Sequence, residues 1–185
     1  MTNTAGRPRD LLDALIQQHR AVEYLLNRLR RTYDDGRRDL ADQVITILVR
    51  HLLLEERLLY PVVRGYLVDG PDRADHAVHE HDQLEVILRE LERVDPVDGR
   101  FPYTVMDLQT AFMEHIADEE SQVFAQLRFA VPADELGRLG DDAEAVERSL
   151  GSAPGGPTVN DLLLLSVGAG PGMVDRLRAL LEGRP

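Results

Sequence analysis

The amino-acid sequence predicts an all-α protein, an antiparallel, up-down-up-down four-helix bundle with a short C-terminal helical extension. Turn signals rich in Asp, Gly and Pro divide residues 10–130 into four long stretches. In each stretch apolar side chains recur at spacings of three and four residues, the period of an amphipathic α-helix, and no stretch alternates as a strand does. The loops between the stretches are short, which favours antiparallel neighbours.

The four expected helices follow from where the periodic stretches begin and end. The first ends at the run Asp34-Asp35-Gly36, and Asp72 is placed to cap the third. Pro61 has no backbone N–H, so it should kink the second helix or end its regular part. The expected helices span residues 10–33, 39–66, 72–94 and 102–130.

The character of the chain changes after the fourth helix. We therefore expect a bundle domain at residues 10–130 and an extension at residues 131–185, which packs on the bundle or on a partner. The expected parts of the extension are an acidic helix at 133–150, a Gly/Pro/Ser linker at 151–157 and a last helix that ends near Leu181.

Composition excludes several classes of function. The 185 residues include 33 acidic and 21 basic side chains, with a formal net charge of −12, and no cysteine. Without cysteine there is no disulfide, Cys-ligated metal or thiol nucleophile, which suits a reducing cytosol, so we expect a cytoplasmic protein. The N-terminus lacks the apolar core of a secretory signal, and the longest apolar run is far short of the roughly 20 residues that span a bilayer. A basic patch is also missing, so we expect neither a membrane nor nucleic acid as a partner.

Four of the six histidines lie one per expected helix, on the apolar side and at similar intervals along the chain. In an antiparallel bundle such positions can meet at one level of the interior. A single histidine on an apolar face is more often a core residue satisfied by a neighbour, but four imidazoles in one core are costly to bury without a shared partner. A metal is the natural partner for these residues, which are His19, His51, His81 and His115.

A glutamate follows each of these histidines by four residues, one turn along the same helical face. Imidazole and carboxylate together suit ions such as iron or manganese, and a bridging carboxylate can hold two ions a few ångströms apart. The four pairs predict a metal site, although not that all eight residues are ligands. The pairs are His19/Glu23, His51/Glu55, His81/Glu85 and His115/Glu119.

The segments QHRAVEYLL, HLLLEERLLYP, EHDQLEVIL and HIADEESQVF resemble the hemerythrin family, specifically its HHE cation-binding subgroup. This resemblance implies a bundle that holds two iron ions joined by an oxo or hydroxo bridge, with Glu55 and Glu119 as bridging carboxylates. The acidic helix and the GAGPG segment of the extension resemble those of actinobacterial members. The metal ligands implied by the resemblance are His19, His51, Glu55, His81, His115 and Glu119.

Two positions depart from the pattern of oxygen-carrying hemerythrins. Those proteins have a second histidine in the third helix, four residues before the position of His81, where this chain has Ala77. They also place the carboxylate of the fourth helix five residues after its histidine, a position held here by Glu120 beside Glu119. The first departure implies that one iron has fewer nitrogen ligands, with a position filled by water, by an extra carboxylate or by nothing. An open position favours reactivity over reversible oxygen carriage.

Other polar residues near the motifs are candidates for lesser roles. Glu23 and Glu85 are extra-ligand candidates, although a solvated or outer position is preferred. Tyr60 lies nine residues after His51, on the far side of a straight helix, so packing or exposure is preferred unless a wide turn brings its phenol to the site for a redox or hydrogen-bonding role. Residues expected on the surface are His76 and His79, and the acidic Glu56, Glu114, Asp118 and Glu120, of which any acidic one could instead orient a ligand histidine.

Three functions are consistent with these patterns. The first is a non-haem di-iron protein that reacts with hydrogen peroxide, nitric oxide or dioxygen, with catalase-like decomposition of peroxide favoured. The second is an oxygen or iron sensor that binds without turnover and whose metal state controls the extension. The third, a structural metal or an iron store, ranks last because a single two-metal site stores little. A monomer or weak homodimer is expected.

Overall fold

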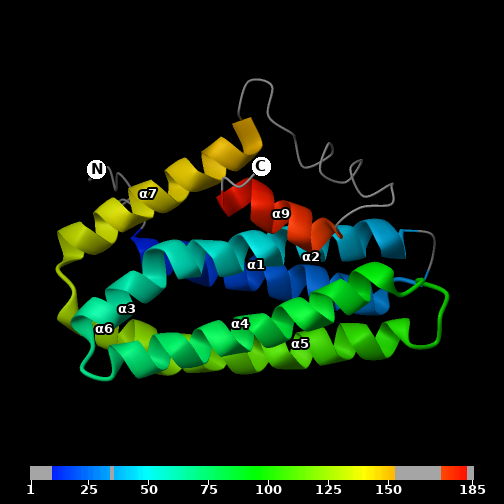
Figure 1. The fold of residues 1–185 in the computed structure, drawn as a ribbon, viewed down its shortest axis with the longest axis horizontal. Coiled ribbons are helices and arrows are strands. Elements are labelled where there is room, and N and C mark those ends of the chain that lie inside the picture. Colours follow the sequence, from blue (N-terminus) through cyan, green and yellow to red (C-terminus); the bar gives the residue numbers. More distant parts are fainter. Residues whose placement is uncertain (1–9, 34–35, 153–171, 183–185) are drawn as a thin grey trace, which may run out of the picture.

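The structure is a computed structural model that describes residues 10–33, 36–152 and 172–182. Every regular element in that part of the chain is helical, which confirms the predicted fold class. The described helices form a bundle of four long rods packed side by side, with α7 (Ala133–Ser152) and α9 (Met173–Glu182) on one side of it (Figure 1). The rods are α1 (Leu11–Arg31); α2, η1 and α3 (Arg37–Leu54, Glu55–Leu59 and Tyr60–Tyr66); α4 (Gly70–Arg93); and α5, η2 and α6 (Phe101–Asp118, Glu119–Val123 and Phe124–Ala130).

Helices α1 and α4 begin in different ways. Asp10 caps α1 by accepting a hydrogen bond from the backbone N–H of Asp13 at 2.9 Å. Arg128 of α6 holds the same end through ion pairs to both aspartates, at 2.9 and 2.6 Å. Helix α4 begins at Gly70, so Asp72 lies in its first turn, and the prediction that Asp72 caps this helix is wrong.

A close approach between α3 and α4 explains the earlier start. A Cβ atom at Gly70 would lie 2.0 Å from the carbonyl oxygen of Val63, so only glycine lets the two helices come this near. Pro71 follows in the first turn of α4, where its missing N–H leaves no hydrogen bond unmade. The third rod therefore begins directly beside the end of the second.

The second and fourth rods each contain one wide turn of π-helix. In η1 the N–H of Tyr60 donates to the carbonyl of Glu55, and in η2 the N–H of Phe124 donates to that of Glu119. These partners are five residues apart rather than four, so each turn holds one extra residue and rotates the following helix by about 100°. Pro61 is the second residue after η1, but the fourth rod has the same turn without a proline. Proline alone therefore does not account for the irregularity.

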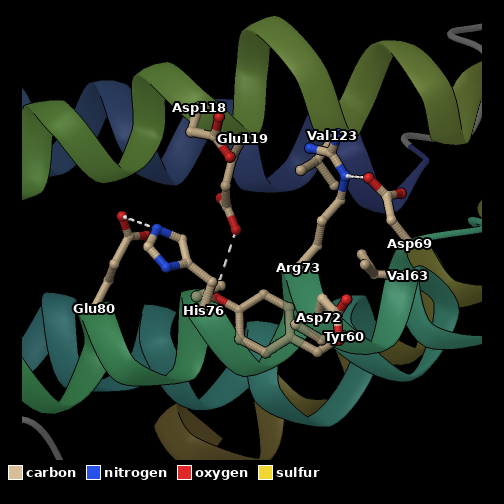
Figure 2. Close-up of a pocket in the computed structure, with 12 residues that line it drawn as sticks. Tyr60, Val63, Asp69, Asp72, Arg73, His76, Glu80, Asp118, Glu119 and Val123 are labelled. Carbon is tan, nitrogen blue, oxygen red and sulfur yellow. Dashed lines mark hydrogen bonds and ion pairs between the residues drawn. The ribbon is translucent and has the colours of Figure 1, made fainter.

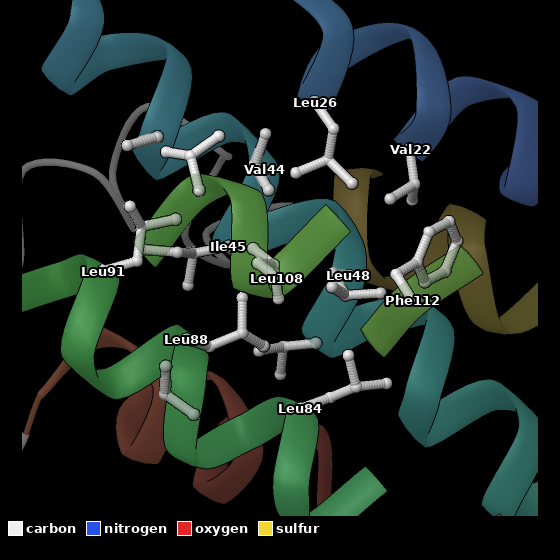
Figure 3. Packing of buried hydrophobic residues seen from close by; sticks show 14 of the residues in the cluster. Val22, Leu26, Val44, Ile45, Leu48, Leu84, Leu88, Leu91, Leu108 and Phe112 are labelled. Atoms are coloured by element: carbon white, nitrogen blue, oxygen red, sulfur yellow. The ribbon is translucent and has the colours of Figure 1, made fainter. Parts of the chain in front are cut away.

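Two apolar clusters fill the bundle on either side of a polar level. Figure 3 shows the first, where side chains from α1, α2, α4 and α5 pack together. The second lies toward the end formed by α3 and α6. Burying one such side chain contributes about 1.5–3 kcal/mol, so the clusters stabilise the bundle independently of the polar residues between them. Fully buried members are Leu26, Leu48, Leu88 and Leu108 in the first cluster, and Leu12, Leu15, Leu59 and Leu127 in the second.

The C-terminal helices pack on the outside of the bundle. Helix α7 (Ala133–Ser152) lies against α1, and α9 (Met173–Glu182) lies against α2 and α4. Met173, Val174 and Leu177 of α9 join the first apolar cluster. This cover explains why α2 is buried on more sides than a single apolar stripe predicts.

The division into a bundle domain at residues 10–130 and an extension at residues 131–185 stays a prediction. Most of the expected linker and of the GAGPG segment falls on residues 153–171, which lie outside the described part of the chain. Of the helices that the structure describes, none has the length and apolar character needed to cross a membrane.

Candidate metal centre

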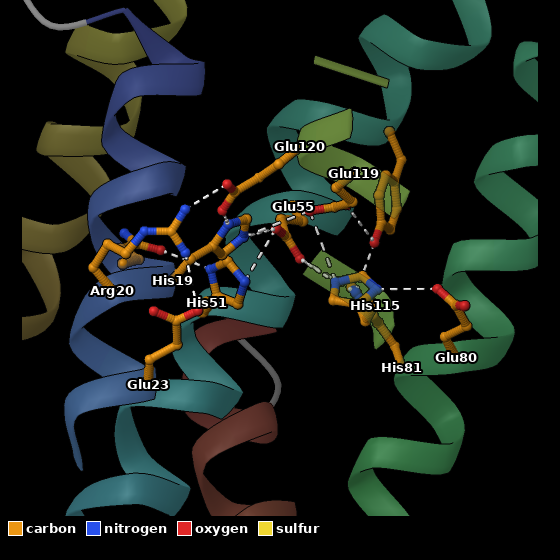
Figure 4. A network of polar contacts seen from close by, with 12 residues as sticks. His19, Arg20, Glu23, His51, Glu55, Glu80, His81, His115, Glu119 and Glu120 are labelled. Atoms are coloured by element: carbon orange, nitrogen blue, oxygen red, sulfur yellow. Dashed lines mark hydrogen bonds and ion pairs between the residues drawn. The ribbon is translucent and has the colours of Figure 1, made fainter. Parts of the chain in front are cut away.

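Side chains from all four rods meet at the polar level between the two apolar clusters. Figure 4 shows imidazoles and carboxylates converging there from α1, the second rod, α4 and the fourth rod. All six residues implied as ligands lie in this group, and each is between 0% and 3% exposed. They are His19, His51, Glu55, His81, His115 and Glu119.

Glu55 lies at the centre of the group. Its Oε1 is 3.1 Å from Nε2 of His51 and 3.5 Å from Nε2 of His19. Its Oε2 is 3.3 Å from Nε2 of His81 and 3.5 Å from Nε2 of His115. Each carboxylate oxygen therefore faces one pair of histidines. Each pair forms with Glu55 a set of three donor atoms within 4.8 Å of one another, a spacing that can hold a metal ion.

Glu119 is a second carboxylate that spans the two pairs. Its Oε2 is 3.6 Å from Nε2 of His19 and 3.8 Å from Nε2 of His115. Its Oε1 is 3.5 Å from the hydroxyl of Tyr60, which also contacts Nε2 of His81 at 2.6 Å. The wide turn η1 explains why Tyr60 faces the site. Of the interpretations open for Tyr60, exposure is wrong, because the side chain is buried and its hydroxyl points into the cluster.

The four imidazoles share one orientation, with Nε2 toward the carboxylates and Nδ1 toward a side-chain oxygen of a neighbouring helix. An N–H at Nδ1 can donate to that oxygen, which leaves the lone pair of Nε2 directed to the centre. These outer contacts set the ring rotation and the tautomer that a metal requires. They join His19 to Glu120 at 2.8 Å, His51 to Gln18 at 3.0 Å, His81 to Glu56 at 2.9 Å and His115 to Glu80 at 3.0 Å.

Unpaired polar atoms at the centre test whether a metal fits. Four buried atoms make no hydrogen bond to any residue that the structure describes: His51 Nε2, Glu55 Oε2, His115 Nε2 and Glu119 Oε2. Leaving a buried polar group unpaired costs about 1–3 kcal/mol, and native cores contain few such groups. Cations bound between the histidine pairs would satisfy all four atoms at once. The donor set therefore fits metal ions.

Burial and mutual contact set the charges of these groups. Burial lowers the pKa of His51 to about 3 despite the nearby charge of Glu55, so this ring is neutral near pH 7. Burial and the charge of Glu55 hold the pKa of Glu119 well above its usual range. Burial acts on Glu55 in the same direction, but His51 and the other imidazoles hold its pKa well below its usual range. The two carboxylates therefore differ: without a metal, Glu119 takes up a proton at a higher pH than Glu55 does.

The two extra-ligand candidates on α1 and α4 turn away from the centre. Glu23 pairs with Arg20 at 3.0 Å on the outside of the bundle. Glu85 is buried, but it pairs with Arg89 at 2.9 Å and with Arg178 of α9. Neither carboxylate joins the cluster, which agrees with the preferred interpretation of an outer position.

The site is built from two corresponding halves, one from each pair of rods. In each half, the residue that precedes the first histidine in the sequence contacts the second histidine of the same half. The residue that follows the glutamate contacts the first histidine of the opposite half. A wide turn begins at the glutamate in both. The matching segments are Gln18-His19 with Glu80-His81, and His51-Leu-Leu-Leu-Glu55-Glu56 with His115-Ile-Ala-Asp-Glu119-Glu120.

The halves differ in how bulky their apolar neighbours are. In the first half, Leu15 is fully buried one turn before the histidine, and the ring of Phe124 stacks on the imidazole with 5.9 Å between centroids. The corresponding residues of the second half are Ala77, a much smaller side chain, and Tyr60. Apolar bulk therefore closes the first half at this place, and the second half keeps open space.

A cavity of about 390 Å³ occupies that space and opens to solvent (Figure 2). Carboxylates at its rim make it electronegative, which disfavours anions. His76 and His79, the two histidines expected on the surface, are both exposed. His76 lies at the rim of this cavity, 3.4 Å from Glu80. The inner wall includes Tyr60, Ala77 and Glu119, and the exposed rim includes Asp69, Asp72 and His76.

A smaller cavity, of about 170 Å³, touches the first half from outside. It lies between α1, α2 and α7, and its lining includes Gln18, His51 and Glu147. Because Gln18 covers Nδ1 of His51, this cavity meets the outer side of the imidazole rather than the carboxylates. The larger cavity is the one whose wall includes a central carboxylate.

The fold and the site define a helical bundle with an internal histidine and carboxylate cluster able to bind metal. The sequence profile of the hemerythrin HHE cation binding domain matches residues 10–127. The chain therefore belongs to the hemerythrin HHE cation binding domain family, and the resemblance seen in its four motifs is confirmed.

Two individual proteins are similar to this chain. A solved structure of a hemerythrin HHE cation binding domain-containing protein from Mycobacterium kansasii has a TM-score of 0.73 and 18% sequence identity, over 91% of this chain and 98% of that chain. At this identity the likeness shows the fold alone. A protein named DNA nickase from Nostoc sp. is 23% identical over 148 residues. The alignment covers 80% of this chain and 42% of that relative, so this chain spans less than half of the relative's length.

The outer partners of the histidines are the residues that sequence reasoning placed least well. For Glu56 and Glu120 the preferred prediction, a solvated acidic face, is wrong, and the alternative, orientation of a ligand histidine, is what the structure has. Gln18 and Glu80 belong to no predicted set. The signal that could find all four is repetition, since each stands directly beside a motif residue in one half and has a counterpart in the other.

Proposed function

We propose that this chain is a non-haem di-iron protein that reacts with a small neutral oxidant, and that its reaction is the decomposition of hydrogen peroxide. The observation that carries the proposal is the difference between the two halves. Both halves supply histidines and share the carboxylates, but a solvent-open cavity reaches Tyr60 and Glu119 in the half where Ala77 replaces bulk. The proposed metal ligands are His19, His51, Glu55, His81, His115 and Glu119, with both glutamates shared between two iron ions.

Bound iron would supply a redox centre able to exchange electrons with the oxidant. The residues of the chain select the oxidant and position it. The cavity admits a molecule of a few atoms to the hydroxyl of Tyr60. Its acidic rim disfavours anions, so hydrogen peroxide, dioxygen and nitric oxide form the substrate class. Burial, with the charges of Glu55 and Glu119, raises the pKa of Tyr60, so its O–H stays protonated and can donate a hydrogen bond to such a molecule.

Replacing Ala77 tests the role of the cavity of about 390 Å³ beside the second half of the site. The iron-loaded protein should release dioxygen from hydrogen peroxide faster than the same amount of free iron. Ala77→His occupies the part of the cavity beside Ala77 and restores the histidine that oxygen carriers have there. We expect it to slow peroxide decomposition by about tenfold, equal to about 1.4 kcal/mol in the barrier. Its visible spectrum should also change reversibly when dioxygen is added and removed.

Ala77→Leu is the matched control, because it copies the bulk of Leu15 without adding a nitrogen ligand. It should slow peroxide decomposition as well, but without the reversible response to dioxygen. If the parent protein releases no dioxygen above free iron at matched iron content, the catalytic proposal fails. If neither Ala77 variant decomposes peroxide more slowly than the parent, the oxidant does not react at this cavity.

A sensor that binds dioxygen or iron without turnover is the second candidate. The observation that favours it is contact between the extension and the outer partners of the histidines, since Arg178 of α9 pairs with Glu56, and Glu147 of α7 accepts a hydrogen bond from Gln18. A reversible dioxygen spectrum without peroxide decomposition would support sensing. For either function we propose a cytoplasmic protein, monomeric or weakly dimeric.

Nucleic acid stays outside the proposal. The name DNA nickase belongs to a relative of which this chain spans less than half. Binding to a phosphate backbone rests on basic side chains, and this chain has 33 acidic against 21 basic ones.

A further inference from the structure

Arg178 of α9 connects the C-terminal extension to the candidate metal centre. Its side chain is 20% exposed, and it pairs with Glu56 through two nitrogens, at 2.8 and 3.0 Å, and with Glu85. Glu56 is also the residue that contacts Nδ1 of His81 at 2.9 Å. One side chain, that of Glu56, therefore stands between an arginine of the extension and a histidine of the centre.

The first half of the site contains the same arrangement within the bundle itself. Glu120 contacts Nδ1 of His19 at 2.8 Å and pairs with Arg20 at 2.5 Å. Arg20 also pairs with Glu23 at 3.0 Å. In both halves one arginine pairs with two glutamates. One glutamate contacts Nδ1 of the histidine, and the other follows that histidine by four residues in the sequence. In the first half this arginine directly follows the histidine in α1.

The second half has no arginine at the corresponding place in the sequence. The residue after His81 is Asp82, which is exposed and acidic and so cannot pair with Glu56 or Glu85. Arg178 reaches those two carboxylates from α9 instead. Helix α9 thus completes in the second half a contact that α1 makes unaided in the first.

We propose that Arg178 is a positioning residue of the metal centre, which holds Glu56 against Nδ1 of His81 as Arg20 holds Glu120 in the other half. The inference rests on the proposed function, because it takes His81 as a metal ligand. A carboxylate held from both sides keeps one orientation, and so the imidazole keeps its Nε2 directed to the centre. Since the arginine belongs to α9, metal binding and docking of α9 favour each other by the same factor.

Arg89 offers a matched control. It joins α4 to α9 through an ion pair with Asp175 at 2.9 Å and contacts Glu85 at 2.9 Å. Arg89→Ala therefore removes an anchor of the extension of similar charge and leaves the contacts among Arg178, Glu56 and His81 in place. A general loosening of α9 would appear in this variant as well.

The test measures the affinity of the full chain for ferrous iron, by anaerobic competition with a coloured chelator. Arg178→Ala should bind iron roughly tenfold more weakly, the lower end of the effect of losing an outer partner of a metal ligand. Arg89→Ala should bind iron like the parent. The double variant Asp82→Arg/Arg178→Ala copies the first half and should recover most of the affinity. Thermal melting of the metal-free proteins shows that each variant is folded before its affinity is compared.

Amide hydrogen exchange supplies a second measurement, which does not depend on activity. Iron should slow exchange along α9 in the parent and much less so in Arg178→Ala. Equal iron affinity in the parent and Arg178→Ala, an equal loss in Arg89→Ala, or no recovery in the double variant would overturn the inference and leave the proposed di-iron site standing. A parent protein that binds no iron would overturn both.

Discussion

Replacing Glu55 with alanine is expected to lower the iron content of the purified protein from two ions per chain to one or none. Glu55 faces both histidine pairs, with one oxygen 3.1 Å from His51 and the other 3.3 Å from His81. Without it, Glu119 is the one central carboxylate left to offset the repulsion between two dications, which is strong at short range in a buried site. Metal analysis and the visible spectrum of the purified variant measure the outcome.

Glu23→Ala is the matched control for this change. Glu23 also follows a histidine by one turn, but it pairs with Arg20 on the outside of the bundle, so its variant should keep both ions. Glu55→Ala should remain helical by circular dichroism, because the apolar clusters are untouched. A folded Glu55→Ala protein that still binds two irons would show that Glu55 does not bridge them.

Removal of the metal should lower the melting temperature by roughly 10 °C. A ligand that binds only the folded state stabilises it by about 4 kcal/mol when it is present at 1,000 times its Kd, and in a chain of this size 1 kcal/mol corresponds to roughly 2–4 °C. The metal-free site also keeps buried polar atoms that make no hydrogen bond to the residues that the structure describes, such as Glu55 Oε2 and His115 Nε2. Calorimetry of the protein with and without metal measures the shift.

The metal-free protein should stay largely helical below its melting temperature, because both apolar clusters remain. Glu55→Ala serves as the control, since its melting temperature should respond much less to added iron. Equal melting temperatures for the parent with and without metal would mean that the ions bind at a peripheral place and not at the buried centre.

The architecture and the six central residues could be predicted because both follow from regular spacings between residues that are close together in the sequence. Apolar residues at the helical period define each rod, and a histidine with a glutamate one turn later recurs in all four rods. The pattern did not separate the central pairs from the outer ones. Glu55 and Glu119 turn inward and Glu23 turns outward, although each follows a histidine by the same interval.

Features that depend on the path of the backbone or on distant segments could not be read in this way. The wide turn η1 places the hydroxyl of Tyr60 beside His81, whereas the wheel of a regular helix turns it away. The contact between Arg178 and Glu56 joins residues more than a hundred positions apart, and the sequence gives no local sign of it. The start of α4 depends on the backbone of Val63 beside Gly70, a contact between two helices.

The number of residues in the two wide turns determines how the helices after them are rotated. Loss of one residue between 55 and 59 would let η1 become a regular α-helix with a stronger hydrogen-bond ladder. The same loss would turn all of α3 by about 100° about its axis, carrying Tyr60 away from the centre and the apolar side of α3 toward water. Apart from the glutamates that face the histidines, a substitution within these five-residue turns should therefore be tolerated more readily than a deletion, because the number of residues sets the direction of the helix that follows.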